Sequence, residues 1–217
     1  MINILGNTHS ILNQFIAEMR DTEIQKDSLR FRRNMERIGE IFAYEVSKTM
    51  PYETRDVITP LGVAASNVLS RQPVLASILR AGLPVHQGML GIFDHAQNAF
   101  VSAYRKHHKD NTFTINIEYC SSPDLNGKTL ILADPMLATG ASMVLAYKEL
   151  LHHGKPGHTH FVTILASTEG VEYVKKHLPE KDITLWIGQV DDELTAQAYI
   201  VPGLGDAGDL AYGSKLS

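Results

Sequence analysis

Apolar residues in this 217-residue chain recur first at helical spacing and later in short unbroken runs. In residues 11–19 and 31–42 they return every three or four positions, which predicts two amphipathic helices near the N-terminus. Asp27 and Ser28 are candidate N-caps of the second helix. The polar face of that helix carries several arginines, and we expect a solvated face there rather than a regulatory anion site. These arginines are Arg30, Arg32, Arg33 and Arg37.

From residue 73 onward, apolar runs alternate with helical patterns. The runs at 73–79, 99–104, 128–133, 159–166 and 183–187 indicate buried strands, and the alternation at 113–119 indicates a strand with one wet face. Helical patterns run to residue 90, from 143 to 151 and from 169 to 177. This order predicts an α/β fold, an open and mostly parallel sheet flanked by helices. We expect a small β-hairpin, or hood, between Pro51 and Pro60.

No repeat or low-complexity linker divides the chain, so we expect one domain over residues 1–217. Within it, residues 1–50 supply the N-terminal helical extension, residues 73–190 the α/β core, and residues 191–217 a C-terminal segment. The helices and the hairpin region exceed what a minimal sheet domain needs, so a homo-oligomer is expected.

Composition narrows the class of protein. A net charge of −4 and a pI near 6.2 disfavour a protein that coats nucleic acid. No apolar run approaches the ~20 residues of a membrane span. Cys120 is the only cysteine, and no signal peptide is visible, so we expect a cytoplasmic protein with neither nucleic-acid nor membrane partners.

The stretch most indicative of chemistry follows the apolar run at 128–133. There Asp134 and Pro135 lead into a Thr-Gly-Ala-Ser turn and then into a helical pattern. A loop that opens a helix directs free backbone N–H groups at its ligand and binds phosphate without a basic side chain. Asp134 would accept hydrogen bonds from hydroxyls beside it, so a phosphorylated sugar is the expected occupant. The stretch also fits an ordinary strand–turn–helix, and it is neither an ATPase-type P-loop nor a Gly-x-Gly-x-x-Gly motif.

Residues 199–209 form a second unusual stretch, rich in glycine and aspartate. The stretch looks too irregular for a helix or a strand, yet it holds apolar residues that a disordered tail lacks. Its glycines allow the backbone to approach a ligand closely. We therefore expect a binding loop.

Together these stretches resemble uracil phosphoribosyltransferases. The family's signatures match residues 134–140 and 199–209 without interruption, and residues 78–83 and 104–105 resemble two further blocks in the expected order. The resemblance implies a glycosyltransferase of pyrimidine salvage that makes UMP and diphosphate from uracil and 5-phospho-α-D-ribose 1-diphosphate (PRPP), with Mg²⁺. It also suggests a homo-oligomer and, in some members, GTP as an effector.

The resemblance assigns roles residue by residue. Arg80 and Arg105 would contact the diphosphate of PRPP, and Arg80, Arg105, Asp134 and Asp206 would be the catalytic residues. Uracil would bind at Ile200, Gly205, Asp206 and Ala207, with Asp206 also near PRPP. The remainder of the PRPP site would be formed by Asp134, Pro135, Met136, Leu137, Ala138, Thr139, Gly140, Ala141 and Ser142.

Two features qualify this interpretation. Many phosphoribosyltransferases carry two adjacent acids where this chain has Asp134 and Pro135, so Mg²⁺ would be held mainly through the oxygens of PRPP and by no protein metal site. No general base stands out, although Asp206 is a candidate.

The polar run at 105–111 would either cover the site or form a plain solvated loop. The rival hypotheses are a phosphoribosyltransferase for another nucleobase and a non-catalytic sensor of PRPP or UMP on the same scaffold.

Other candidate residues carry no role. We expect the histidines at 152, 153, 158 and 160 to lie at the surface rather than in a metal site. Cys120 is expected to be an unreactive thiol at a strand end, and Trp186 a core residue.

Overall fold

The computed structural model describes residues 1–107, 113–178 and 180–214. Within them an eight-stranded sheet has the order β1-β10-β9-β7-β4-β5-β6, with β8 beside β9. All pairs are parallel except β5–β6, which is antiparallel. The expected open, mostly parallel sheet is confirmed. Its strands are β1 (Ile2–Ile4), β4 (Val74–Leu79), β5 (Gln97–His107), β6 (Phe113–Ser121), β7 (Thr129–Ala133), β8 (Met136–Leu137), β9 (His158–Ser167) and β10 (Ile183–Asp191).

The central strands are apolar on both faces because helices cover both sides of the sheet. Successive side chains of a strand point to opposite faces, so Leu75 and Ile131 join one core cluster while Val74 and Leu130 join the other. Both clusters are fully enclosed at the sheet centre, where Leu75 and Leu130 have no exposed surface.

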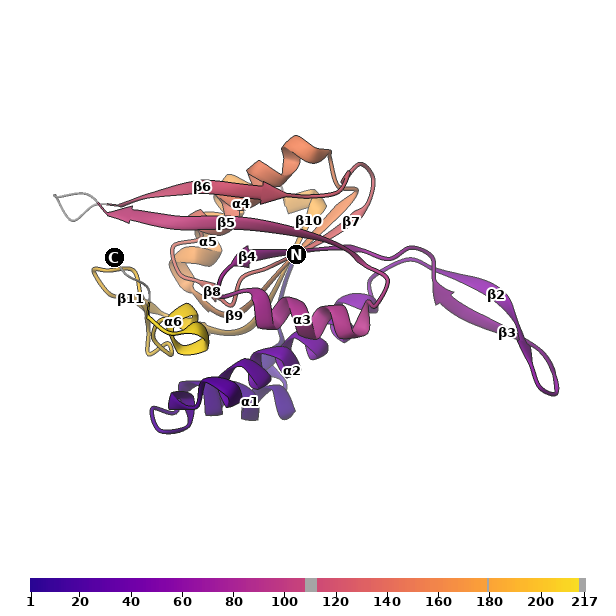
Figure 1. Cartoon of the computed structure of the whole chain (residues 1–217), viewed down its shortest axis with the longest axis horizontal. Coiled ribbons are helices and arrows are strands. Elements are labelled where there is room, and N and C mark those ends of the chain that lie inside the picture. Colours follow the sequence, from indigo (N-terminus) through magenta and orange to yellow (C-terminus); the bar gives the residue numbers. More distant parts are fainter. Residues whose placement is uncertain (108–112, 179, 215–217) are drawn as a thin grey trace.

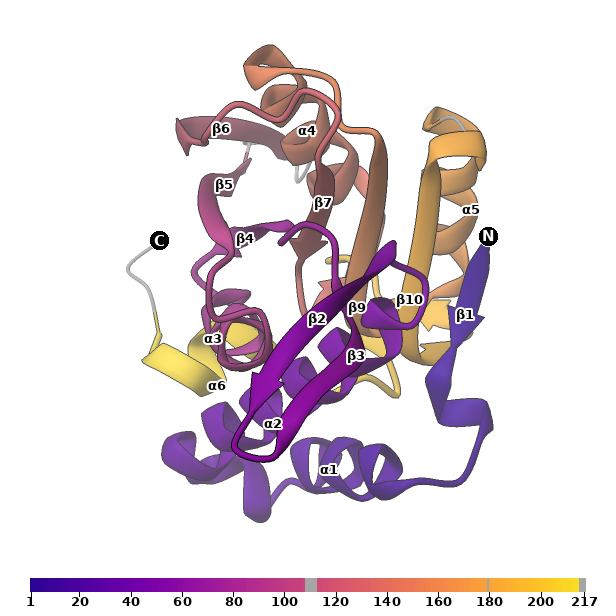
Figure 2. The ribbon, with the colours of Figure 1, turned by 90° about the vertical axis from the view of Figure 1, so that its right-hand side faces the viewer.

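The helices divide between the two faces of the sheet (Figure 2). Helices α1, α2, α3 and α6 pack with one cluster, and α4 and α5 with the other. Their bounds are α1 (Ile11–Arg20), α2 (Ser28–Ser47), α3 (Leu83–Ile92), α4 (Ala141–Leu150), α5 (Thr168–His177) and α6 (Ala207–Tyr212). Short 3-10 turns occupy Leu5–Asn7, Ile24–Lys26, Leu151–His153 and Glu180–Asp182.

Two antiparallel hairpins extend beyond this body (Figure 1). One, formed by β2 (Tyr52–Thr59) and β3 (Gly62–Leu69), matches the expected hairpin but continues to Leu69. The other is β5–β6. Because β5 runs to His107, the polar run expected as a loop from residue 105 is partly strand. Residues 108–112 of that run lie outside the described residues.

The structure corrects two sequence expectations about local structure and adds one strand that the sequence pattern missed. The stretch at 199–209 is not wholly irregular: β12 (Ile200–Val201) pairs antiparallel with β11 (Glu193–Leu194), and α6 begins at Ala207. Strand β1 had no periodic signal because it has only three half-buried residues, and its pairing with β10 defines it. His160 is not at the surface but 4% exposed.

Other local expectations are confirmed or refined. Asp27 is the N-cap of α2, where its side chain accepts hydrogen bonds from two backbone N–H groups, and Trp186 is buried as expected. On the basic face of α2, Arg32 is half-buried and donates to the Ala211 carbonyl at 2.6 Å. Within the described residues, no helix is both long and apolar enough to cross a lipid bilayer.

Candidate active site

The loop after β7 places Asp134 at the carboxyl end of the sheet. Its backbone N–H donates to the Val162 carbonyl at 3.1 Å, and its Oδ1 accepts from the Met136 N–H at 3.3 Å. Pro135 then accepts from the N–H groups of Ile164 and Leu165, so that β8 runs along β9. These contacts fix the half-buried carboxylate of Asp134 at the edge where ligands of open α/β sheets bind.

Beyond β8, the chain turns sharply into α4. Gly140, the residue before the helix, has φ of +78°, a left-handed conformation in which a side chain would be strained. The first helical residues, Ala141 and Ser142, begin a ten-residue helix whose N-terminus follows the Asp134 loop directly, and the Ala141 N–H donates to Thr139 Oγ1 at 3.5 Å. This geometry suits a phosphate group.

The start of α5 packs against the same loop. Ser167 Oγ donates to the Ala138 carbonyl and accepts from the Gly170 N–H, the latter at 2.8 Å. A Cβ atom at Gly170 would lie 2.4 Å from the Ala138 carbonyl oxygen and 2.5 Å from that of Leu137. The loop backbone thus rests directly on α5, and sequence patterns gave no signal for this contact.

Arg80 follows β4, the strand next to β7. A Cβ atom at Gly82 would lie 2.8 Å from the Ala133 carbonyl oxygen, so the loop of Arg80 lies against the end of β7. The guanidinium of Arg80 is 43% exposed and donates to Asp209 Oδ1 at 3.3 Å and to the Gly213 carbonyl at 3.2 Å. The structure therefore brings the block at 78–83 against the C-terminal segment.

The C-terminal segment combines buried anchors with an open position at Gly205. The side chains of Ile200 and Ala207 are 4% and 2% exposed and belong to the core. Between them Gly205 has φ of +93° and nothing but one leucine methyl group within 4 Å of its Cβ position. Asp206 caps α6 by accepting from the Asp209 N–H at 3.0 Å. A ligand at this loop would meet mainly backbone groups.

Arg105 lies on β5, opposite Ile115 of β6. The last residue of β4, Leu79, is paired with Ser102, so Arg105 lies three positions beyond the end of that pairing. Arg80 and Arg105 thus both lie beyond the paired part of neighbouring strands, toward the carboxyl edge of the sheet. Among the described residues, no three His, Cys, Asp or Glu side chains are grouped closely enough to hold a metal ion.

Residues without a sequence motif also shape the site. Arg20, at the end of α1, pairs with Asp191, at the end of β10, and both contact Gly203 in the C-terminal segment. No sequence pattern could identify this pair because its partners are separated by 171 positions. Each is the last residue of its helix or strand, and neither element carries a motif.

A loop and helix N-terminus that suit phosphate, a carboxylate in that loop and an arginine after the neighbouring strand are features typical of proteins that bind a phosphorylated ligand at a sheet edge. Comparison with known proteins specifies the family: the family model described as uracil phosphoribosyltransferase matches residues 6–214 of this chain. The chain belongs to the uracil phosphoribosyltransferase family.

Individual relatives match this chain over nearly its full length. A uracil phosphoribosyltransferase of Porphyromonas gingivalis is 56% identical over 98% of both chains. One of Pyrococcus furiosus is 36% identical over 94% of this chain and 86% of its own. The solved structure of the AQ2163 protein from Aquifex aeolicus superimposes over all of both chains with a TM-score of 0.87 at 30% identity.

Proposed function

We propose that this chain transfers the phosphoribosyl group of PRPP to uracil, yielding UMP and diphosphate. Family membership across residues 6–214 supports the reaction. The observation that carries it onto this site is the convergence of three segments: the Asp134 loop, the Arg80 loop and the turn around Asp206, with Arg80 in contact with Asp209 at 3.3 Å. Each segment offers the chemistry that one part of the bound substrates needs.

The first of these parts is the ribose 5-phosphate. We propose that it binds residues 134–142, with its oxygens on the N–H groups at the start of α4. The half-buried Asp134 would accept hydrogen bonds from ribose hydroxyls and orient the ring. Binding energy at this phosphate, which does not react, then holds the reacting carbon in position.

The leaving group is the second part. In the reaction the C1–O bond of the sugar to diphosphate breaks and a C1–N1 bond to uracil forms, so negative charge develops on diphosphate. Arginine forks stabilise such charge, and we propose Arg80 and Arg105 for this role. The present contacts of Arg80 with Asp209 and Gly213 are long and half-exposed, so its guanidinium can exchange them for phosphate at little cost.

Uracil is the third part. It presents an N3–H donor between two carbonyl acceptors, and the loop at 200–207 offers backbone N–H and C=O groups. Because the side chains of Ile200 and Ala207 are buried in the core, the proposed recognition relies on their backbone and on Gly205. Cytosine reverses the donor pattern at two positions and would leave buried groups unpaired. Asp206 is the proposed acceptor for the proton that uracil loses from N1.

Mg²⁺ is the proposed cofactor, held mainly through the oxygens of PRPP. When bound, it neutralises charge on the diphosphate. Asp134 is the protein carboxylate that would face it, either directly or through ribose hydroxyls. The proposal also retains a homo-oligomer, a GTP effector and a cytoplasmic location as predictions. Light scattering would test the homo-oligomer, and assays with and without GTP would test the effector.

The deciding experiment incubates purified protein with uracil, PRPP and Mg²⁺ and measures UMP. Formation of UMP only when all three are present supports the proposal, and no UMP refutes it. Cytosine and hypoxanthine as competing substrates test the rival hypothesis of another nucleobase. Tight binding of PRPP or UMP without turnover would instead favour the sensor.

A further inference from the structure

One ion pair, between Arg20 and Asp191, contacts the backbone of the C-terminal loop. Arg20 and Asp191 form a bidentate pair, with Nη1–Oδ2 and Nη2–Oδ1 both at 2.8 Å. The side chain of Asp191 is 8% exposed and that of Arg20 is 21% exposed. Gln189 Oε1 accepts a further hydrogen bond from Arg20 at 3.1 Å, so the guanidinium is fixed in orientation.

Both backbone groups of Gly203 bind this pair. Its N–H donates to Asp191 Oδ2 at 3.0 Å, and its carbonyl accepts from Arg20 Nη1 at 2.9 Å. Gly203 has φ of +53°, and a Cβ atom there would lie 2.1 Å from the Ile200 carbonyl oxygen. The turn is therefore closed tightly at one residue, and that residue is held by α1 and β10 together.

The position of this turn matters because the neighbouring residues form the proposed uracil site. Gly203 lies between Ile200 and Gly205, and the base would be recognised there by backbone groups. A backbone displaced by a fraction of an ångström misaligns several hydrogen bonds at once, whereas side chains could adjust by rotation. No substrate atom needs to touch Arg20 or Asp191 for them to affect binding of the base.

We propose that Arg20 and Asp191 are positioning residues that set the affinity for uracil through Gly203 and affect PRPP binding much less. The inference rests on the proposed function. The Asp134 loop is held by β9 and α5, and no hydrogen bond links it directly to the Arg20–Asp191 pair among those the structure describes. Loss of the pair should therefore weaken uracil binding much more than PRPP binding, to which this loop would contribute only Asp206.

Burial also determines how the pair responds to substitution. Burial opposes the charge of Asp191, but the hydrogen bonds from Arg20 and Gly203 outweigh it and lower the pKa of this carboxyl. Removing one partner leaves the other charge partly buried and unpaired, which costs more than losing an exposed pair. Arg20→Lys retains the cation but cannot contact both carboxylate oxygens and the Gly203 carbonyl at once.

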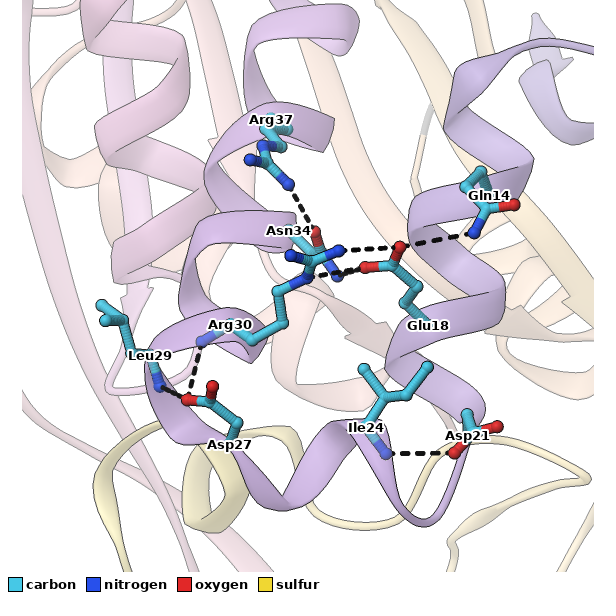
Figure 3. A network of polar contacts seen from close by, with 9 residues as sticks. All are labelled: Gln14, Glu18, Asp21, Ile24, Asp27, Leu29, Arg30, Asn34 and Arg37. Carbon is cyan, nitrogen blue, oxygen red and sulfur yellow. Dashed lines mark hydrogen bonds and ion pairs between the residues drawn. The ribbon is translucent and has the colours of Figure 1, made fainter.

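The chain offers a matched control that also involves helix α1. Arg30 of α2 forms a bidentate pair with Glu18 of α1, with distances of 2.9 and 3.0 Å (Figure 3). Glu18 also binds Asn34 at 2.8 Å, so this pair joins α1 to α2, whereas Arg20 and Asp191 join α1 to β10. Among the described residues, the hydrogen bonds of Glu18 and Arg30 do not reach the C-terminal loop. Arg30→Gln removes an ion pair of similar geometry without affecting Gly203.

The test measures steady-state kinetics of the full chain with uracil and PRPP varied in turn. Arg20→Gln and Asp191→Asn should each raise KM for uracil by roughly 10-fold or more, as expected for losing hydrogen bonds to a charged group. KM for PRPP should stay within about twofold. Arg20→Lys should give an intermediate KM for uracil, and Arg30→Gln should change neither constant.

The outcomes separate the two hypotheses. An active wild-type enzyme whose Arg20 variants bind uracil normally, or lose affinity for both substrates equally, overturns the positioning role but not the proposed function. A wild-type protein that makes no UMP overturns both. If Arg20→Gln fails to fold, Arg20→Lys decides by the same ratio of the two KM changes.

Discussion

Gly170 offers a direct way to move the proposed phosphate loop without substituting any residue assigned to a substrate. It is the third residue of α5, and its missing side chain lets the carbonyls of Leu137 and Ala138 rest on the helix. In Gly170→Ala, the new Cβ would meet these oxygens at 2.5 and 2.4 Å. Ordinary contacts of a Cβ begin near 3.4 Å, so the loop must move by about 1 Å.

The two effects of this substitution differ in size. Overpacking costs about 1–3 kcal/mol, whereas alanine in place of glycine inside a helix returns up to about 1 kcal/mol. The net loss of about 1 kcal/mol would lower Tm by roughly 2–4 °C in a chain of this length. A displacement of about 1 Å of a positioning loop can cost roughly 10²-fold in rate. We therefore expect a folded protein with kcat/KM for PRPP reduced by about 10²-fold and KM for uracil unchanged.

The assay combines UMP formation at varied PRPP with a thermal melt. Gly91→Ala is the matched control because Gly91 also lies in a helix, α3, but nothing lies within 4 Å of its Cβ position. That variant should retain full activity and equal or exceed the wild-type Tm. Unchanged kcat/KM for PRPP in folded Gly170→Ala would refute the view that α5 fixes the phosphate loop.

Three further predictions concern charge and protonation. Asp134→Asn, measured by the same UMP assay, should lower kcat by about 10²-fold while circular dichroism shows a folded protein, and unchanged kinetics would remove Asp134 from the mechanism. Arg80→Lys should lower kcat/KM for PRPP by about 10-fold and leave Tm within a degree or two, because its pair with Asp209 is exposed; a large loss of Tm would contradict this. Burial, aided by His158, lowers the pKa of His160 from 6.5 to about 3, so unfolding takes up a proton below pH 6.5 and stability falls as pH drops from 6.5 toward 3. In His160→Asn, the asparagine can still accept from Trp186 Nε1, and the free energy of unfolding from denaturant melts should fall less steeply with decreasing pH, by up to about 1.4 kcal/mol per pH unit. Equal slopes for the variant and the wild type would exclude His160 as a cause of the pH dependence.

The sequence alone determined the elements whose cause is local. Alternating apolar runs and helical periods predicted the parallel sheet and its two helix layers, because burial on both faces favours apolar residues on both sides of a strand. The Asp134 loop was also readable, since strand, turn residues and helix follow one another directly along the chain. The resemblance to a family supplied the reaction, and membership of that family is confirmed.

Only the tertiary structure decided which distant residues share one edge of the sheet. Arg80 meets Asp209 at 129 positions along the chain, and Arg20 meets Asp191 at 171. Ordinary residues such as Gly170 acquire a role solely from the backbone that lies on them. Likewise β12 and α6 form where sequence suggested irregular chain, because the pairing with β11 and the cap by Asp206 outweigh weak local preferences. Periodicity reports which face of an element is buried, but not its partner, and a site built from several elements depends on the partners.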